Sequence, residues 1–176
     1  MGHWAYSARE VKLRSSSKNH IDVAVSISGS EDWRLTGFYG EPNRSLRRRT
    51  WELLRMLSQQ SSLPWCVIGD LNNITSHEEK KGGRRYPEWL IQGFCETMSD
   101  CNLVDLGMVG YPFTWEKSRG TEDWVEIRLD RALVSQRWLH MYKEATLQNI
   151  EISTSDHMPI FLELRQDTRF SLGRHS

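Results

Sequence analysis

The stretch that most constrains the fold of this chain is an apolar run that ends in a tight polar turn. The run extends from Leu63 to Ile68 and stops at Gly69, which is typical of a short buried strand followed by a turn. Two short polar residues, Asp70 and Asn72, come directly afterwards. Ligands of layered α/β proteins commonly bind at the carboxyl ends of strands. The turn is therefore either a binding site or an Asx turn whose side chains cap the local backbone.

Length and composition indicate one folded domain. A chain of 176 residues with 38% hydrophobic residues and eight tryptophans is long enough for a sizeable core and unlike a disordered chain. We expect the domain at 11–164, after an unpatterned segment at 1–10 and before a polar tail at 165–176. No apolar run approaches the ~20 residues that a membrane helix needs, and the amino terminus has no secretory signal pattern. We therefore expect an intracellular monomer without a membrane partner.

Charge and cysteine content narrow the function classes. The chain has 23 basic and 23 acidic residues and a net charge of zero, whereas a DNA-packaging protein would be strongly basic. This balance argues against tight non-specific binding to nucleic acid but does not exclude a nuclease, because a bound metal and a few local basic residues can handle a phosphate. Cys66, Cys95 and Cys101 have no CxxC spacing, so we expect reduced core thiols.

The order of the expected elements favours a mixed α/β fold. Strands are expected as a hairpin at 21–28 and 33–39 and then at 103–106, 126–134, 145–152 and from 156 onward. Helices are expected from Ser45, which could cap its helix, from Pro87, and after Ser135. No regular βαβ alternation runs through the chain. A layered sandwich with two β-sheets inside and helices outside fits this pattern.

Two basic segments have both a structural and a functional interpretation. Residues 47–49 are three arginines in the first turn of the expected helix; we favour a solvated face over a phosphate-contacting patch. The loop at 76–86 carries Lys80, Lys81, Arg84 and Arg85 and follows the Asp70 turn. It is either a contact for a nucleic-acid backbone or a mobile surface loop.

Charged residues recur late in the chain where a core strand should be apolar. Asp130 lies within the expected strand at 126–134, and Asp156 and His157 directly precede the apolar run at 159–164. Carboxylates are hard oxygen ligands, and a carboxylate beside an imidazole favours the protonated, phosphate-binding form of that ring. A serine hydrolase using Ser155 and His157 fits poorly, because the chain has no Gly-x-Ser-x-Gly elbow.

In this order, the motifs at 69–72, 128–130 and 155–157 resemble those of the endonuclease/exonuclease/phosphatase superfamily, which includes the apurinic endonucleases and pancreatic deoxyribonuclease. The sequence between the motifs is similar to the endonuclease domain of plant LINE-type non-LTR retrotransposons, in the stretches 33–42, 78–83, 103–107 and 113–115. The resemblance runs from about Val11 to Leu164. It implies a four-layered α/β sandwich of two packed β-sheets flanked by helices.

The resemblance also implies roles for individual residues in phosphodiester hydrolysis, with weak, phosphate-directed binding of DNA and action in the nucleus if DNA is the substrate. Asp70 would orient or deprotonate the attacking water, and Asn72 would hold that water or a phosphate oxygen. His157 would contact the phosphate, while Asp130 would hydrogen-bond this histidine and fix its tautomer and charge. Oxygen ligands favour Mg²⁺ or Mn²⁺ as the cofactor.

Two further residues have implied binding roles. Asp156 would help to bind the metal, and Tyr39 would contact the substrate phosphate. From the residues alone, a tyrosine at a strand end is more often half-buried packing.

One departure from the superfamily pattern bears on activity. Superfamily members begin with a strand that carries an Asn and a second strand that ends in a metal-binding Glu. The matched region starts after both, so we expect an amino-terminally truncated copy that lacks the first strands of the fold; Glu10 and Glu31 are weak substitutes. The functions to be distinguished are a metal-dependent DNA endonuclease of retroelement origin, an inactive remnant with weak nucleic-acid binding, and a small-molecule phosphatase.

Overall fold

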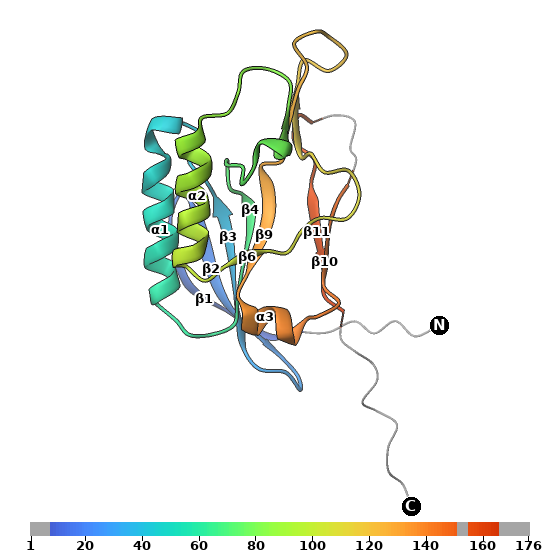
Figure 1. Ribbon diagram of the computed structural model, residues 1–176. Helices are drawn as coiled ribbons and strands as arrows, with labels where there is room; N and C mark the ends of the chain where they lie inside the picture. The colour runs from blue at the N-terminus through green and yellow to red at the C-terminus, as the bar shows by residue number, and fades with distance from the viewer. Residues whose placement is uncertain (1–7, 151–154, 166–176) are drawn as a thin grey trace, which may run out of the picture.

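The computed structural model describes residues 8–150 and 155–165, and its centre is a six-stranded β-sheet (Figure 1). The strands lie in the order β1-β2-β3-β4-β9-β6. Their bounds are β1 Ala8–Ser16, β2 His20–Ile27, β3 Trp33–Tyr39, β4 Trp65–Asp70, β9 Asp130–Val134 and β6 Val104–Asp105. Only β3 and β4 run parallel within this sheet. Their carboxyl ends therefore lie at the same edge, where Tyr39 pairs with Asp70.

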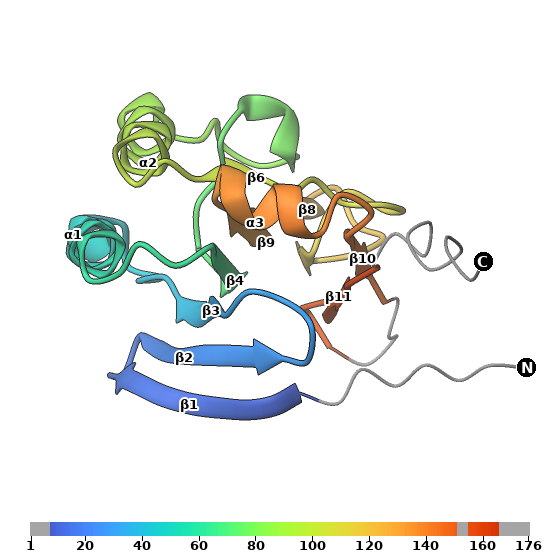
Figure 2. The ribbon, with the colours of Figure 1, turned by 90° about the horizontal axis from the view of Figure 1, so that it is seen from below.

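Two helices cover one face of this sheet. α1 (Arg47–Gln59) and α2 (Glu88–Asp100) lie side by side (Figures 1 and 2). Each has an apolar stripe at helical spacing, and both stripes are buried against Phe38, Val67 and Leu133 of the sheet. This burial removes Trp51, Leu54 and Leu57 of α1 and Leu90, Ile91 and Phe94 of α2 from water, which stabilises the layer.

The opposite face packs on a smaller layer. It consists of the hairpin of β10 (Thr146–Asn149) with β11 (Ile160–Glu163) and the short helix α3 (Gln136–Met141). Trp33, Trp138 and Tyr142 form its centre, with Trp33 edge-on to both other rings. A third sheet joins β5 (Lys80–Lys81), β8 (Val125–Ile127) and β7 (Trp115–Lys117). Single 3-10 turns are η1 (Arg44–Leu46) and η2 (His77–Glu79).

This arrangement confirms the predicted mixed α/β fold with packed sheets flanked by helices. The predicted hairpin is β2–β3, and Ser135 caps α3 by accepting a hydrogen bond from the backbone N–H of Trp138. Cys66 and Cys101 are buried, Cys95 is partly buried, and all three are free thiols as expected. Among the described residues, no helix is long and apolar enough to cross a membrane.

Three predictions about elements were wrong. Ser45 does not cap α1; Asn43 caps η1 instead, and α1 begins after Leu46 without a side-chain cap. The strand expected at 126–134 is two strands, β8 and β9, which belong to different sheets. β1 begins inside the segment at 1–10 that was expected to be unpatterned, because an edge strand exposed along much of its length has no clear apolar alternation.

Parts of three expectations lie outside the described residues. These are the unpatterned segment before residue 8, the end of the strand expected at 145–152, and the polar tail after residue 165.

Candidate active site

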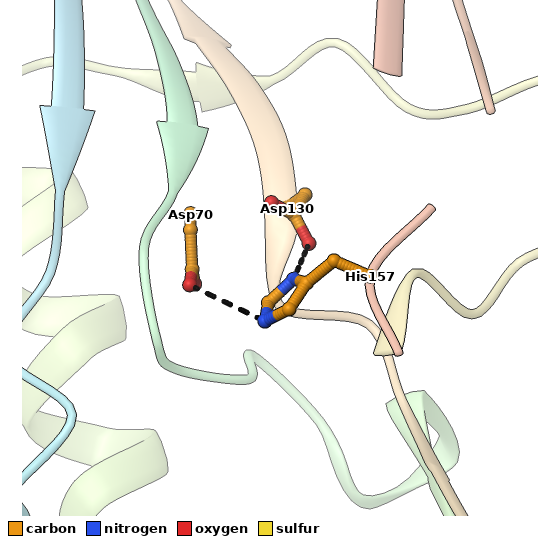
Figure 3. Close-up of side chains that lie close together, drawn as sticks. All are labelled: Asp70, Asp130 and His157. Carbon is orange, nitrogen blue, oxygen red and sulfur yellow. Dashed lines mark hydrogen bonds and ion pairs between the residues drawn. The ribbon is translucent and has the colours of Figure 1, made fainter. Parts of the chain in front are cut away.

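Three distant segments bring Asp70, Asp130 and His157 together at one edge of the central sheet (Figure 3). His157 Nδ1 lies 3.2 Å from Asp130 Oδ2, and His157 Nε2 lies 3.9 Å from Asp70 Oδ2. One ligand atom from each residue falls within 4.8 Å of the other two. The imidazole therefore has one carboxylate on each ring nitrogen, an arrangement that favours its protonated form.

The β4–β9 ladder positions the two carboxylates. Asp70 and Asp130 are direct partners in this antiparallel pair, so their side chains project on the same face of the sheet. Gly69 precedes Asp70 with φ +145°, and a Cβ there would collide with the carbonyl oxygen of Phe38. Only glycine fits at this position, and it allows β4 to stay paired with β3 up to Asp70.

The turn after Asp70 is also an Asx turn. The backbone N–H of Asn72 donates to Asp70 Oδ1 at 2.8 Å, and Asn72 adopts the left-handed conformation with φ 49°. Its side-chain amide donates to the carbonyl of Gly40 at 2.7 Å and is buried. For Asp70 the structural and functional interpretations are compatible, because its second oxygen is directed at His157 (Figure 3). Asn72 is not a member of the three-residue group, and its role in holding the water or a phosphate oxygen stays a prediction.

Thr114 links the segments that carry Asp130 and His157. Its buried Oγ1 accepts hydrogen bonds from the backbone N–H groups of Leu129 and Asp130, both at 3.0 Å. Its carbonyl accepts from the N–H of Met158 at 2.8 Å, and the adjacent Trp115 forms a β-bridge with His157. Thr114 therefore positions both partners of the His157–Asp130 hydrogen bond.

The pKa values of Asp70 and His157 are both raised in this group. Burial, with the nearby Asp130 carboxylate second, raises the pKa of Asp70 to about 6. The pKa of His157 is also raised, mainly by its hydrogen bond to Asp130. A carboxyl group whose pKa is raised by burial and by a neighbouring carboxylate is a common feature of catalytic and metal sites.

A cavity of about 430 Å³ opens onto these groups. Its polar lining includes Tyr39, Asp70, Asp130 and His157. Tyr39 is 48% exposed at the end of β3, which is compatible with both the packing and the phosphate-contact interpretations. Asp156 is exposed and is not a member of the three-residue group; its role as a metal ligand stays a prediction.

The chemistry of this group suits a divalent cation. The two carboxylates offer the oxygen ligands that Mg²⁺ and Mn²⁺ prefer, whereas a protonated His157 ring has no free lone pair for a metal. A cation would also relieve the repulsion between Asp70 and Asp130. Within the part of the chain that the structure describes, no glutamate joins this group.

Sequence reasoning did not identify the buried charges behind the site. Arg131 is fully buried and pairs with Glu79 and Asp105 at 2.8 Å each, and Arg128 pairs with the same two carboxylates. Arg131 also donates to the carbonyl of Asn73 at 3.0 Å. The network ties the loop after Asp70 to β9. In the sequence, the only signal for this network was a cluster of charged residues within an expected strand.

The prediction of a solvated arginine face at 47–49 was wrong for its first member. Arg47 is buried and donates to Tyr86 and Asn73, while Arg48 and Arg49 are exposed. Burial lowers the pKa of Arg47. Arg47 therefore supports the loop beside the site, and the functional interpretation of a three-arginine patch does not hold.

Thr114→Val should destabilise the protein by about 2 kcal/mol or more, because it leaves two buried backbone N–H groups without an acceptor. Thr114→Ser keeps the oxygen and should remain close to the parent protein. Thr97→Val is a matched control, since the buried Thr97 hydroxyl donates only to the carbonyl of Gly93 within α2. Urea denaturation compares the three variants. Equal losses in the two valine variants would contradict the role assigned to Thr114.

Comparison with known proteins gives one family match and several similar folds. The sequence model described as the endonuclease/exonuclease/phosphatase family matches residues 3–157. The endonuclease domain of TRAS1, a telomere-specific non-LTR retrotransposon, is a solved structure with TM-score 0.67 and 15% identity, covering 91% of this chain and 71% of its own. An endonuclease/exonuclease/phosphatase family protein from Leptotrichia buccalis C-1013-b has TM-score 0.57 and 14% identity, covering 92% and 63% respectively. No curated protein matches the sequence. At these identities, the two structures establish the shared fold alone.

Proposed function

Because the chain belongs to the endonuclease/exonuclease/phosphatase family, we propose that it hydrolyses phosphodiester bonds with a divalent metal and acts as a DNA endonuclease of retroelement origin. The observation that carries this proposal is the convergence of Asp70, Asp130 and His157 beside a cavity of about 430 Å³. Phosphodiester hydrolysis needs an activated water and neutralisation of charge on the phosphate. In this group Asp70 would be the base that activates the water, and protonated His157 would neutralise charge on the phosphate.

Asp70 is the base in this proposal. Its pKa, raised to about 6 by burial, lies close to neutrality, where a carboxylate is still ionised and accepts a proton more readily than an ordinary aspartate. The proton of the attacking water would pass to Asp70 Oδ2, while Oδ1 stays bonded to the backbone of Asn72. Asn72 is proposed to hold the water or a phosphate oxygen.

His157 is the cation that faces the phosphate. Its hydrogen bond to Asp130 raises its pKa and holds the ring in one orientation. Tyr39, which also lines the cavity, would contact a further phosphate oxygen. Mg²⁺ or Mn²⁺, held by the site carboxylates with help from Asp156, would neutralise phosphate charge and acidify water when bound.

Two observations support the retroelement part of the proposal. The sequence between the motifs resembles plant LINE-type endonuclease domains, and the TRAS1 endonuclease domain shares the fold. If chromosomal DNA is the substrate, the protein acts in the nucleus.

A non-catalytic remnant is the second candidate. It is favoured by the absence of a glutamate from the group of Asp70, Asp130 and His157 among the described residues, since loss of a metal carboxylate lowers activity by large factors. Such a protein would be folded and would bind metal and nucleic acid weakly. It would not hydrolyse phosphodiester bonds.

Mg²⁺-dependent nicking of supercoiled plasmid separates these candidates. We expect nicking that stops on chelation and falls at least roughly 100-fold in His157→Ala, because the phosphate loses its positive partner. His140→Ala, at an exposed position on α3, is the matched control and should nick normally. Nicking that persists in His157→Ala would indicate a contaminant. A folded protein without nicking would support the remnant, and turnover of soluble phosphate monoesters alone would identify a phosphatase.

A further inference from the structure

The segment that begins with β5 is basic, and hydrogen bonds hold it in place. Lys80 Nζ donates to the carbonyl of Gly82 and, at 2.7 Å, to that of Arg84. Gly82 has φ +76°, and a Cβ there would collide with the carbonyl of Trp124 in the β7–β8 connection. We call residues 80–86 the basic loop. These contacts favour a prearranged binding surface over a mobile loop, which was the alternative interpretation of its sequence.

Positive charge is in excess around this loop. A cavity of about 370 Å³ is lined by His77, Lys80, Arg84, Arg85 and Tyr86, together with the two glycines. The guanidinium of Arg44 lies 5.2 Å from the Tyr86 ring. Burial, and secondly this guanidinium, lower the pKa of Lys80.

Negative charge around this cavity is sparse. Glu88 contacts His77 at 2.7 Å and lies 3.9 Å from Arg85. Among the described residues, Arg84 is in no ion pair. A cavity with this lining fits an anion.

The strand register places this cavity at a defined distance from the active site. Lys80 pairs with Ile127, Ile127 with Trp115, and Trp115 with His157. These four residues form one row across neighbouring strands, so Lys80 and His157 lie three strand spacings apart. At about 4.8 Å per spacing, the separation is roughly 14 Å. Paired residues also project on the same face.

This separation matches a polynucleotide. A polynucleotide carries a phosphate at every nucleotide along its strand, so one substrate molecule can place two phosphates roughly 14 Å apart. We propose that the basic loop binds a second backbone phosphate of the same polynucleotide, away from the scissile phosphate at His157. The substrate class is then a polynucleotide, and a small phosphate ester would not reach both sites. The inference rests on the proposed phosphodiesterase function.

The test uses the double variant Arg84→Gln/Arg85→Gln of the full chain. Both side chains are exposed and outside the catalytic group, so the fold should be retained. Lys12→Gln/Lys143→Gln removes the same charge from exposed positions on β1 and after α3, away from the basic loop (Figure 1). The first measurement is metal-free binding of a labelled duplex at several salt concentrations. Each lost phosphate contact should reduce the steepness of log K against log salt by roughly 1.

The second measurement compares two substrates. For plasmid, kcat/KM should fall in the arginine double variant, with the change mainly in KM, because ground-state and transition-state binding are lost together. For bis(p-nitrophenyl) phosphate, which is a minimal phosphodiester, kcat/KM should not change. An unchanged salt slope, or equal losses on both substrates, would overturn the inference. Failure of all variants and the parent to turn over either substrate would reject the proposed function, whereas the binding measurement would still decide the role of the loop.

Discussion

Replacing Asp70 by asparagine should abolish Mg²⁺-dependent nicking and, at the same time, stabilise the folded protein at neutral pH. The amide cannot accept the proton of the attacking water, so we expect the rate to fall by roughly 1,000-fold or more. The substitution also removes a buried carboxylate whose pKa is raised from 3.8 to about 6. Asparagine can still accept the N–H of residue 72, which preserves the turn. The Asp70 carboxylate therefore lowers the stability of the folded protein and is needed for its activity.

The pH dependence of this stabilisation follows from linkage. Between pH 3.8 and about 6 the folded protein holds a proton on Asp70 that the unfolded chain has released, so stability falls as pH rises through this window. Below the window Asp70 is neutral in both states and the parent protein carries no penalty. Above it, the full penalty of about 2–3 kcal/mol applies. Asp70→Asn should therefore exceed the parent in stability at pH 7 and lose most of that advantage near pH 4.

Chemical denaturation at both pH values, without and with Mg²⁺, measures this difference. Mg²⁺ should stabilise the parent but not the variant, because a ligand stabilises only the state that binds it. Asp100→Asn, in an exposed pair with Arg55 at the end of α2, is the matched control and should change little. A variant less stable than the parent at pH 7 without metal would show that the Asp70 carboxylate is not destabilising.

Arg131→Met should produce the largest loss of stability of any single substitution considered for this protein. Arg131 is fully buried between Glu79 and Asp105, and its guanidinium lies 5.8 Å from the Phe94 ring. Its removal leaves two partly buried carboxylates with Arg128 as their remaining ion-pair partner. Breaking a buried ion pair on one side typically costs about 3–5 kcal/mol, which is a large part of the total stability of a domain this size.

The urea midpoint of Arg131→Met should fall accordingly, and nicking should fall with it, because Arg131 also holds the loop that follows Asp70 through the carbonyl of Asn73. Arg55→Met is the matched control. Arg55 pairs with Asp100 at 2.9 Å on the surface, and an exposed pair contributes less than about 1 kcal/mol. Similar losses of stability in both variants would mean that the Arg131 ion pairs contribute no more than an exposed pair.

Local patterns in the sequence predicted the parts of the fold that depend on local physics. The β2–β3 hairpin, the apolar stripe of α2 and the cap of α3 by Ser135 follow from alternation, helical spacing and capping chemistry. The same patterns failed at 126–134, where an apolar and charged run looked continuous. Its division into β8 and β9 depends on Thr114, which is distant in sequence and accepts the N–H groups of Leu129 and Asp130.

The sequence by itself determined the chemistry available to this protein: carboxylates at the ends of strands, a histidine before the last strand, and a basic loop after the Asp70 turn. Only the tertiary structure decided which of these meet. Asp130 and His157 are 27 residues apart and Arg131 and Glu79 are 52 apart. Whether a charged residue in a strand is solvated, catalytic or buried in an ion pair depends on partners brought to it by sheet register and loop packing. Those contacts are non-local, and no periodicity within one segment specifies them.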